Sequence, residues 1–237
     1  FSVGEYQEVT LSSYYPKNEL DLTADMLYAS SDMSHKEIKG IVDELPYDKK
    51  LEIFNTYIGE RLNRRHRPGR ALEKAFYNWD LVCDFGIFRD LQRHRMVSDL
   101  EWQNLSPRFG YKIPKLIEDA NLVDMFEECF DLSLSLYSKL HENSPIEAQY
   151  ATLMGHMMRW KISYNAREAM HFHELRTAPQ GHPEYRRLVK IMHDEMSNVH
   201  PLLAASMKFV NKDEDPELTR LAAEKYTQYK LEKINKQ

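Results

Sequence analysis

The sequence predicts an α+β fold in which a small, mainly antiparallel sheet packs against long helices. Segments that alternate β-forming and polar residues fall before residue 83, whereas helical periodicity dominates from residue 119 onward. No internal repeat is present. With 237 residues the chain is long enough to bury a core without disulfide or metal staples. We therefore expect a single domain over residues 1–237.

The first half alternates strands with short helices. Ser34 and Glu37 match a capping box, and Asp84 is well placed to cap the helix that follows the second strand. The expected elements are a strand over residues 6–11, a helix over 22–29, a short helix between Ser34 and Pro46, a helix over 48–64, and a strand over 76–82.

The second half is predicted to be mostly helical after a polar, irregular stretch over residues 98–111. One apolar stripe combines Leu122, Phe126, Cys129, Phe130, Tyr137 and Leu140. The expected helices cover residues 119–141, 146–176 and 183–199, and Asp215-Pro216 opens a last one.

Composition indicates an ordinary globular protein of the reducing cytoplasm. The hydrophobic fraction is 42% and the charged fraction 29%, and a net charge of −5 argues neither for nucleic acid nor for a membrane surface. No apolar run reaches the roughly 18 residues of a membrane span, and no secretory segment precedes the domain. The chain starts at Phe1 without Met, which fits a trimmed chain or a piece of a longer polypeptide.

The cysteines and histidines give little sign of catalysis or metal binding. Cys83 and Cys129 both occupy apolar positions, so we expect both to be inert core residues. His171 and His173 are two residues apart, and on a helix they point about 200° apart. We therefore expect no metal site.

The arginines are more informative. Arg61, Arg64, Arg65, Arg67 and Arg70 crowd one predicted helix end, where they fit a solvated face or a nucleic-acid contact. A different position is held by Arg93 and Arg95, where an apolar helix meets a polar loop. That junction suits a bound anion, because a guanidinium matches phosphate geometry.

The residues around these arginines resemble the flavin-dependent thymidylate synthase family, whose signature is RHRxxSxNExSxRY. Residues 93–98 read RHRMVS and residues 104–108 read NLSPR. Residues 164–172 read YNAREAMHF and are similar to the family's second conserved helix, with Leu175-Arg176 after them. The resemblance covers roughly residues 6–210, and His66 and Glu73 match the family upstream of RHR.

The resemblance implies an α+β homotetramer with active sites shared between subunits. It implies methylation of deoxyuridylate at carbon 5, so that dUMP becomes dTMP. The methylene comes from methylenetetrahydrofolate, and the hydride comes from FAD that NADPH has reduced. In this family no enzyme cysteine attacks the base.

Site residues carried over from the resemblance fall into two groups. The nucleotide is assigned to Ser106, Arg108 and Arg176, of which Arg176 is also the catalytic candidate. The expected FAD-binding residues are His66, Arg93, His94, Arg95, Asn165 and His171.

Several positions depart from the family pattern, mainly on the nucleotide side. The chain has three extra residues between Ser98 and Arg108, within residues 99–102, and Gln103-Asn104 replaces the family's Asn-Glu. Asp90, Gln149 and Gln180 stand where the family has Gln, Arg and His, although His182 lies close to the last position. Each lost charge-assisted hydrogen bond is worth about 1.5–3 kcal/mol, so we expect weakened deoxyuridylate binding.

Three functions remain open on the sequence. The first is an active flavoenzyme acting on a uracil nucleotide. The second is a non-catalytic homologue that forms a structural or regulatory half of a longer protein. The third is nucleic-acid binding through residues 61–70.

Overall fold

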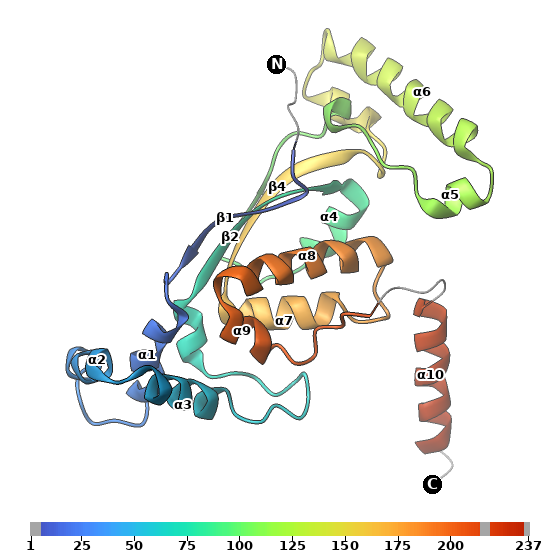
Figure 1. The fold of residues 1–237 in the computed structure, drawn as a ribbon. Helices are drawn as coiled ribbons and strands as arrows, with labels where there is room; N and C mark the ends of the chain where they lie inside the picture. The colour runs from blue at the N-terminus through green and yellow to red at the C-terminus, as the bar shows by residue number, and fades with distance from the viewer. Residues whose placement is uncertain (1–5, 214–218, 235–237) are drawn as a thin grey trace. The chain divides into compact units, whose positions relative to one another are not determined.

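The computed structural model describes residues 6–213 and 219–234 and confirms the α+β class (Figure 1). Its antiparallel sheet has the order β1 (Val9–Tyr15), β2 (Phe76–Asp84), β4 (Met157–Asn165) and β3 (Asp99–Trp102). The predicted pairing of the first two strands in one sheet is thereby confirmed. Asp215-Pro216, predicted to open the last helix, lies outside the described residues.

The described chain divides into two compact units, and strands β1, β2 and β4 each contribute residues to both. Unit 1 comprises residues 6–10, 80–95 and 99–162. Unit 2 comprises residues 11–79, 96–98, 163–213 and 219–234.

Unit 2 contains most of the helices. Ser34 caps α2 with both bonds of the predicted capping box, and the predicted helix over 183–199 is confirmed as α8. The helices of this unit are η1 (Glu19–Leu22), α1 (Thr23–Tyr28), α2 (His35–Glu44), α3 (Tyr47–Ile58), η2 (Arg70–Lys74), α7 (Ala166–Arg176), α8 (Pro183–Val199), α9 (Pro201–Ser206) and α10 (Thr219–Ile234).

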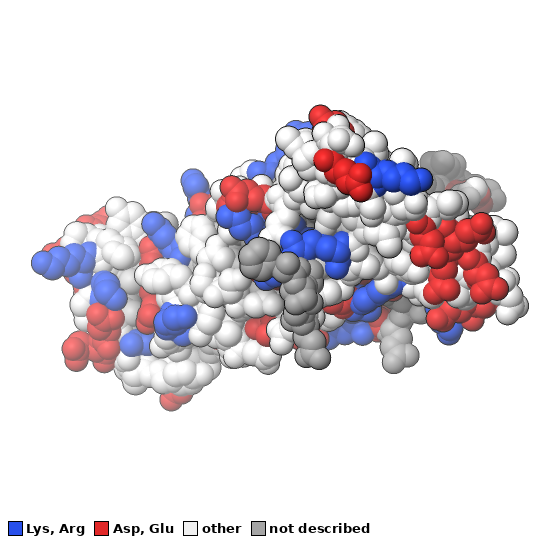
Figure 2. All heavy atoms as spheres, turned by 90° about the horizontal axis from the view of Figure 1, so that it is seen from above, with Lys and Arg blue, Asp and Glu red and all other residues white. Residues whose placement is uncertain are grey.

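Unit 1 contains the remaining helices of the described chain. The predicted cap is present, since the Asp84 side chain accepts a hydrogen bond from the Ile87 N–H at 2.8 Å. Acidic side chains gather over α5 and the start of α6 (Figure 2). The helices of this unit are α4 (Phe85–Leu91), η3 (Pro107–Phe109), α5 (Lys115–Asp119), α6 (Val123–His141) and η4 (Glu147–Ala151).

The largest correction concerns residues 146–176, which were predicted to be one nearly unbroken helix. Only residues 166–176 form an α-helix, and strand β4 occupies residues 157–165. Met158, Trp160, Ile162 and Tyr164 are all at most 2% exposed, whereas the intervening Lys161 is exposed. This alternation with a period of two is the pattern of a strand, and burial of one whole face overrides the helical propensity of the flanking residues.

Three smaller elements also differ from the prediction. Strand β1 begins at Val9 and runs to Tyr15, three residues later than expected at its start. Helix α3 ends at Ile58 because Gly59 adopts φ +65°, so residues 60–64 are not helical. Residues 99–102, predicted to be irregular, form β3, in which Asp99 and Glu101 pair with Lys161 of β4 at 3.1 and 2.9 Å.

The core of unit 2 contains a buried ion pair. Arg61 Nη1 and Nη2 donate to the two carboxylate oxygens of Glu174 at 2.5 and 2.7 Å, and both side chains are at most 4% exposed. Arg61 also donates to the carbonyl oxygens of Arg64, His66 and Ser206. The prediction that Arg61 lies on a solvated arginine face is therefore wrong. Arg61 is buried and fixes the loop after α3.

The two cysteines have different environments. Cys83 is buried and accepts a hydrogen bond from Trp160 Nε1 at 3.2 Å, and burial raises the pKa of its thiol to about 12. Cys129 is exposed on α6, so its assignment to the core is wrong. The cause is that the apolar pattern of α6 is wider than the face that unit 1 buries.

Glu174→Gln should destabilise the protein by about 3–5 kcal/mol, because the substitution leaves the Arg61 charge buried without its partner. Urea unfolding followed by circular dichroism measures the change. Glu52→Gln is the matched control, because the Lys49–Glu52 pair is exposed and its loss should leave the midpoint unchanged. Equal midpoints for the two variants would contradict the structural weight given to the buried pair.

Gly155→Ala should destabilise the protein by about 1–3 kcal/mol, because an added Cβ would lie 2.8 Å from Cζ of Phe130. Gly40→Ala is the control: Gly40 lies inside α2, no atom lies within 4 Å of the added Cβ, and alanine favours a helix. Thermal unfolding should therefore move in opposite directions for the two variants. A Gly155→Ala protein as stable as the original would rule out tight packing of Phe130 on this glycine.

Candidate functional site

The predicted site residues are divided between the two units. Unit 2 carries His66, Asn165, His171 and Arg176. Unit 1 carries Arg93, His94, Arg95, Ser106 and Arg108.

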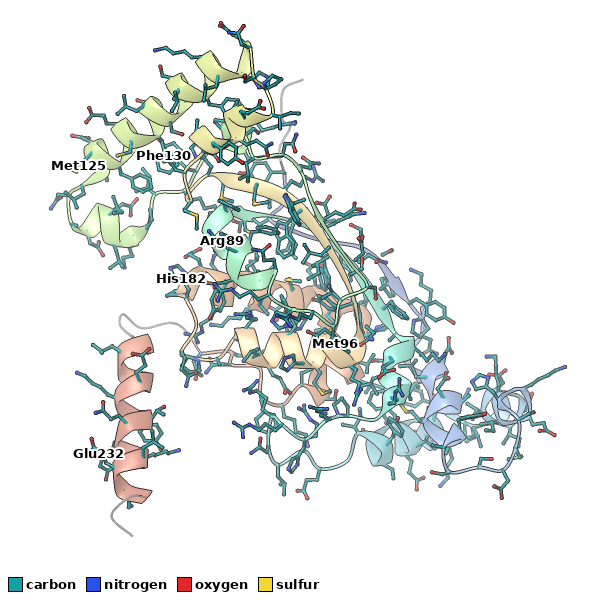
Figure 3. All side chains as sticks on the ribbon, turned by 180° about the vertical axis from the view of Figure 1, so that it is seen from behind. Arg89, Met96, Met125, Phe130, His182 and Glu232 are labelled. Carbon is teal, nitrogen blue, oxygen red and sulfur yellow. The ribbon has the colours of Figure 1, made fainter. Side chains whose placement is uncertain are left out.

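Helix α4 delivers the RHR residues at its C-terminal end. Arg93 Nη2 forms an ion pair with Asp90 Oδ1 at 3.0 Å, and its Nε donates to the Arg89 carbonyl at 3.1 Å. The guanidinium of the neighbouring Arg89 lies over the Phe85 ring (Arg89 is labelled in Figure 3). The i,i+3 spacing of Asp90 and Arg93 at the end of the helix explains the pairing. Part of the Arg93 charge is therefore offset within the protein.

His94 and Arg95 follow in the loop and differ in exposure. His94 is buried, and its N–H donates to the Leu91 carbonyl, which continues the turn of α4. Arg95 is exposed. An exposed guanidinium beside a buried imidazole leaves Arg95 as the residue of this segment that is best placed to reach an anionic ligand.

The short helix η3 carries Ser106 and Arg108. Ser106 is the N-cap residue of η3, and its buried Oγ has no hydrogen-bond partner in the described structure. Arg108 is exposed, with its guanidinium 5.1 Å from the centroid of the Phe109 ring. A buried hydroxyl without a partner is costly, so such an atom commonly marks a place where a ligand or water binds.

Gln149, which replaces a family arginine, has a structural role in this region. Its Oε1 accepts from the Leu105 N–H at 2.9 Å, and its Nε2 donates to the Ile146 carbonyl at 3.0 Å. The amide therefore fixes the backbone immediately before Ser106. An arginine could not accept the Leu105 bond, because a guanidinium only donates.

In unit 2 the junction between β4 and α7 positions Asn165 and His171. Asn165 is the N-cap residue, and its Oδ1 accepts from the Glu168 N–H at 2.9 Å, which leaves the Nδ2 group of this side chain as a donor. His171 is exposed on α7, three residues after Glu168. Ligand atoms of Glu168 and His171 lie within 4.8 Å of each other.

The prediction that the side chains of His171 and His173 point in different directions is confirmed. His173 is fully buried, with its Nε2 3.0 Å from the hydroxyl of Tyr164, whereas His171 is exposed. Burial raises the pKa of Tyr164 well above its ordinary value. His173 and Tyr164 are therefore part of the core, and His171 alone of the two histidines presents its imidazole on the outer face of α7.

Arg176 ends α7. Its guanidinium lies 5.5 Å from the centroid of the Tyr185 ring, which restricts its position by a cation–π contact. His182, close to the position of the family's missing histidine, is the N-cap of α8, and its Nδ1 accepts from the Glu184 N–H (Figure 3). His182 therefore has a local structural role, as Gln149 does.

His66 is exposed in the loop that Arg61 anchors. The His66 N–H donates to the Asn63 carbonyl at 2.9 Å. Farther along, Arg167 of α7 donates to Glu73 at 2.8 Å and to the Pro68 carbonyl at 3.1 Å. The bond from Arg70, followed by that from Arg167, lowers the pKa of Glu73, so this carboxylate stays ionised.

Sequence reasoning missed two contributors to this unit. Glu168 was not singled out, although its spacing of three from His171 places both on one face of a helix. The partnership of Glu174 with Arg61 was also missed, because 113 residues separate them and no local pattern joins them.

The candidate site residues of the two units provide different kinds of hydrogen-bond donor. Unit 1 presents guanidinium groups and an unsatisfied hydroxyl, which suit phosphate. Unit 2 presents an amide, an imidazole and a guanidinium along α7, which suit the polar edge of a planar ring.

Comparison with known proteins places the chain among relatives that are longer than it is. The chain is 32% identical over 209 residues to a UPF0159 protein of Chlamydia muridarum, covering 88% of this chain and 39% of that protein. It is 31% identical over 231 residues to a UPF0159 protein of Thermoplasma acidophilum, covering 93% and 44%. The chain thus spans about two fifths of the length of the curated relatives it matches.

A solved structure has a similar fold. It is a UMP/dUMP methylase, PolB, from Streptomyces cacaoi, bound with 5-Br dUMP. The two folds align with a TM-score of 0.65 at 15% identity, over 88% of this chain and 97% of the other. In the described part of this chain, no helix is long and apolar enough to cross a membrane.

The match to a family model agrees with the resemblance read from the RHR and NAR segments. The model for the thymidylate synthase complementing protein matches residues 10–202, which include the RHR segment, η3 and the whole of α7. The chain belongs to the thymidylate synthase complementing protein family, that of the flavin-dependent thymidylate synthases.

Proposed function

We propose that this chain is a FAD-dependent, thymidylate synthase-like enzyme that methylates a uracil nucleotide and converts dUMP to dTMP. The observation that carries the proposal is the unsatisfied Ser106 hydroxyl on the same short helix as the exposed Arg108. The family assigns the nucleotide to both of these positions. A hydroxyl and a guanidinium together match the oxygens of a phosphate monoester.

The residues that would hold FAD fit its chemistry. In unit 1, Arg93, His94 and Arg95 supply cationic and ring donors for a pyrophosphate. In unit 2, His66, Asn165 and His171 supply an amide and imidazoles for the polar groups of the isoalloxazine. When bound, the reduced flavin supplies the hydride for the new methyl group, with NADPH as reductant and methylenetetrahydrofolate as carbon donor.

Arg176 is the residue to which we assign catalysis. Its guanidinium is permanently charged, and Tyr185 restricts its position. A cation held in this way would bind the uracil carbonyl groups and stabilise negative charge that develops on the ring. Cys83 takes no part, because a thiol with a pKa of about 12 stays protonated at neutral pH.

The Asp90–Arg93 pair sets the expected selectivity. A carboxylate 3.0 Å from the arginine competes with any phosphate for the same guanidinium. The charge on Asp90 also repels a dianionic nucleotide bound nearby. We therefore expect deoxyuridylate to bind more weakly than it does to family members with glutamine at this position.

The proposed enzyme is cytoplasmic and acts as a homo-oligomer, a tetramer in which subunits share active sites. A second candidate is a non-catalytic structural or regulatory half of a longer protein. It is favoured by the length of the curated relatives, of which this chain spans about two fifths. Turnover of dUMP to dTMP with methylenetetrahydrofolate and NADPH separates the two, because the second candidate produces no dTMP.

FAD should bind the purified chain, and Arg95→Ala should weaken binding at least about tenfold, because it removes a charged hydrogen bond to the pyrophosphate. Arg93→Ala should have a smaller effect, since Arg93 already pairs with Asp90. Isothermal calorimetry measures both affinities. Arg89→Ala is the control, because Arg89 is an exposed arginine on α4, the helix just before the RHR segment, and its loss should leave the affinity unchanged. A chain that binds no FAD would remove the flavoenzyme proposal.

Asp90→Asn should tighten deoxyuridylate binding about tenfold, because it removes a carboxylate that competes with the phosphate and repels it. Titration with the nucleotide in 50–300 mM salt should show the gain shrinking as salt screens the charges. FAD affinity, measured in parallel, should also rise, because the substitution releases Arg93 for the flavin pyrophosphate. An unchanged deoxyuridylate affinity would mean that Asp90 does not face the nucleotide.

A further inference from the structure

The segment over residues 103–110, which we call the η3 segment, carries the two candidate nucleotide-binding side chains of unit 1. Both of its ends are bonded to strand β4. At its start, the Gln103 N–H donates to the Arg159 carbonyl at 3.0 Å. At its end, the Gly110 carbonyl accepts from the Met157 N–H at 2.9 Å. These bonds fix where the segment leaves and rejoins the sheet, whereas the residues between them need other contacts to hold their positions.

Inside the η3 segment, the side chain of Gln149 holds the backbone. Its Oε1 accepts from the Leu105 N–H at 2.9 Å, and its Nε2 donates to the Ile146 carbonyl at 3.0 Å. An N–H can only donate and a carbonyl can only accept, so these two partners define the orientation of the amide. The bond to Leu105 lies immediately before Ser106, whose buried Oγ has no hydrogen-bond partner in the part of the chain that the structure describes.

Gln149 itself belongs to a firmly attached element, the short helix η4. Ala148 and Ala151 of this helix are at most 7% exposed, and Ser133 Oγ of α6 donates to the Ala151 carbonyl at 2.6 Å. The Thr152 hydroxyl donates to the Gln149 carbonyl at 2.8 Å at the end of the helix. The amide of Gln149 therefore connects the η3 segment to a packed part of the same unit.

We infer that Gln149 is a positioning residue: through Leu105 it holds the Ser106 hydroxyl and the Arg108 guanidinium where they receive the phosphate of a nucleotide. The inference rests on the proposed function, which assigns the nucleotide to these two side chains. A segment that is ordered before binding loses less conformational entropy when the ligand binds. Gln149 therefore raises the affinity for the nucleotide without touching it. The family's arginine at this position could not do so through Leu105, because a guanidinium accepts no hydrogen bond.

Hydrogen–deuterium exchange of the Leu105 amide, resolved by NMR in the ligand-free chain, tests the positioning directly. Gln149→Leu and Gln149→Arg should each speed this exchange at least about tenfold, because neither side chain replaces the lost acceptor. Gln149→Glu should keep the exchange slow, because a carboxylate accepts the same bond. Gln7→Leu is the control, since Gln7 is an exposed glutamine of the same unit. Unchanged exchange in Gln149→Leu would overturn the inference.

Titration with deoxyuridylate tests what the positioning does for the ligand. Gln149→Leu should weaken binding about fivefold, the effect of one hydrogen bond, and Gln7→Leu should leave it unchanged. Gln149→Arg restores the family's residue and adds a cation, yet it should not tighten binding, because it releases the η3 segment. Tighter binding by Gln149→Arg than by the native chain would show that position 149 faces the ligand, and would overturn the inference.

A native chain that does not bind deoxyuridylate, or that binds it no better than Gln149→Leu does, would also overturn the inference. FAD binding and turnover, measured on the same samples, decide the proposed function separately. Nucleotide binding that depends on Gln149 in a chain without FAD or turnover contradicts only the proposed function. In an active enzyme, Gln149→Leu should raise the KM for dUMP and leave kcat unchanged, because the residue acts on binding. Turnover with an unchanged KM contradicts only the role of Gln149.

Discussion

The arrangement of unit 2 depends on the buried ion pair between Arg61 and Glu174. Glu174 lies on α7, the helix that also carries His171 and Arg176 and begins after Asn165. Arg61 holds the carbonyl oxygens of Arg64 and His66, so the loop with His66 is tied to that helix. A buried pair with further hydrogen bonds is strongly unfavourable to break, although its net stabilisation is modest. Its main contribution here is therefore to fix one loop against one helix.

Local signals predicted much of the fold, and they failed where distant contacts decide. Ser34 and Asp84 were recognised as caps because their partners lie three residues away. Strand β4 was predicted to be helical, because the helical pattern of residues 166–176 was extended backwards through it. Its alternation of buried and less buried residues becomes clear only when the strand is paired in the sheet. The candidate site residues were predicted from the resemblance of motifs. The partners of Arg61 and Gln149 could be found only in the fold, because Arg61 is 113 residues from Glu174 and Gln149 is 44 residues from Leu105.

The residues at or near the positions that depart from the family motif bind groups of the protein itself. Gln149 and His182 each fix local backbone, one before η3 and the other at the start of α8. Asp90 binds the arginine that follows it by one helical turn. At positions 90 and 149, where the family has glutamine and arginine, the residues of this chain thus contribute to local structure. The RHR segment, Asn165 and His171 keep the family's residues, so in the proposed assignment the changes fall on the nucleotide side rather than on the flavin side.

Helix α6 has two apolar faces, of which one is packed inside its unit and the other is exposed. The face with Phe130 requires Gly155 opposite it, because a side chain there would overlap the ring. A second apolar face of α6, with Met125, Leu132 and Leu136, has no such constraint inside its unit and remains exposed. The sequence pattern alone did not separate the two faces, because both carry large apolar residues at helical spacing. Packing within the unit, and not hydrophobicity alone, therefore decides which apolar face of this helix is buried.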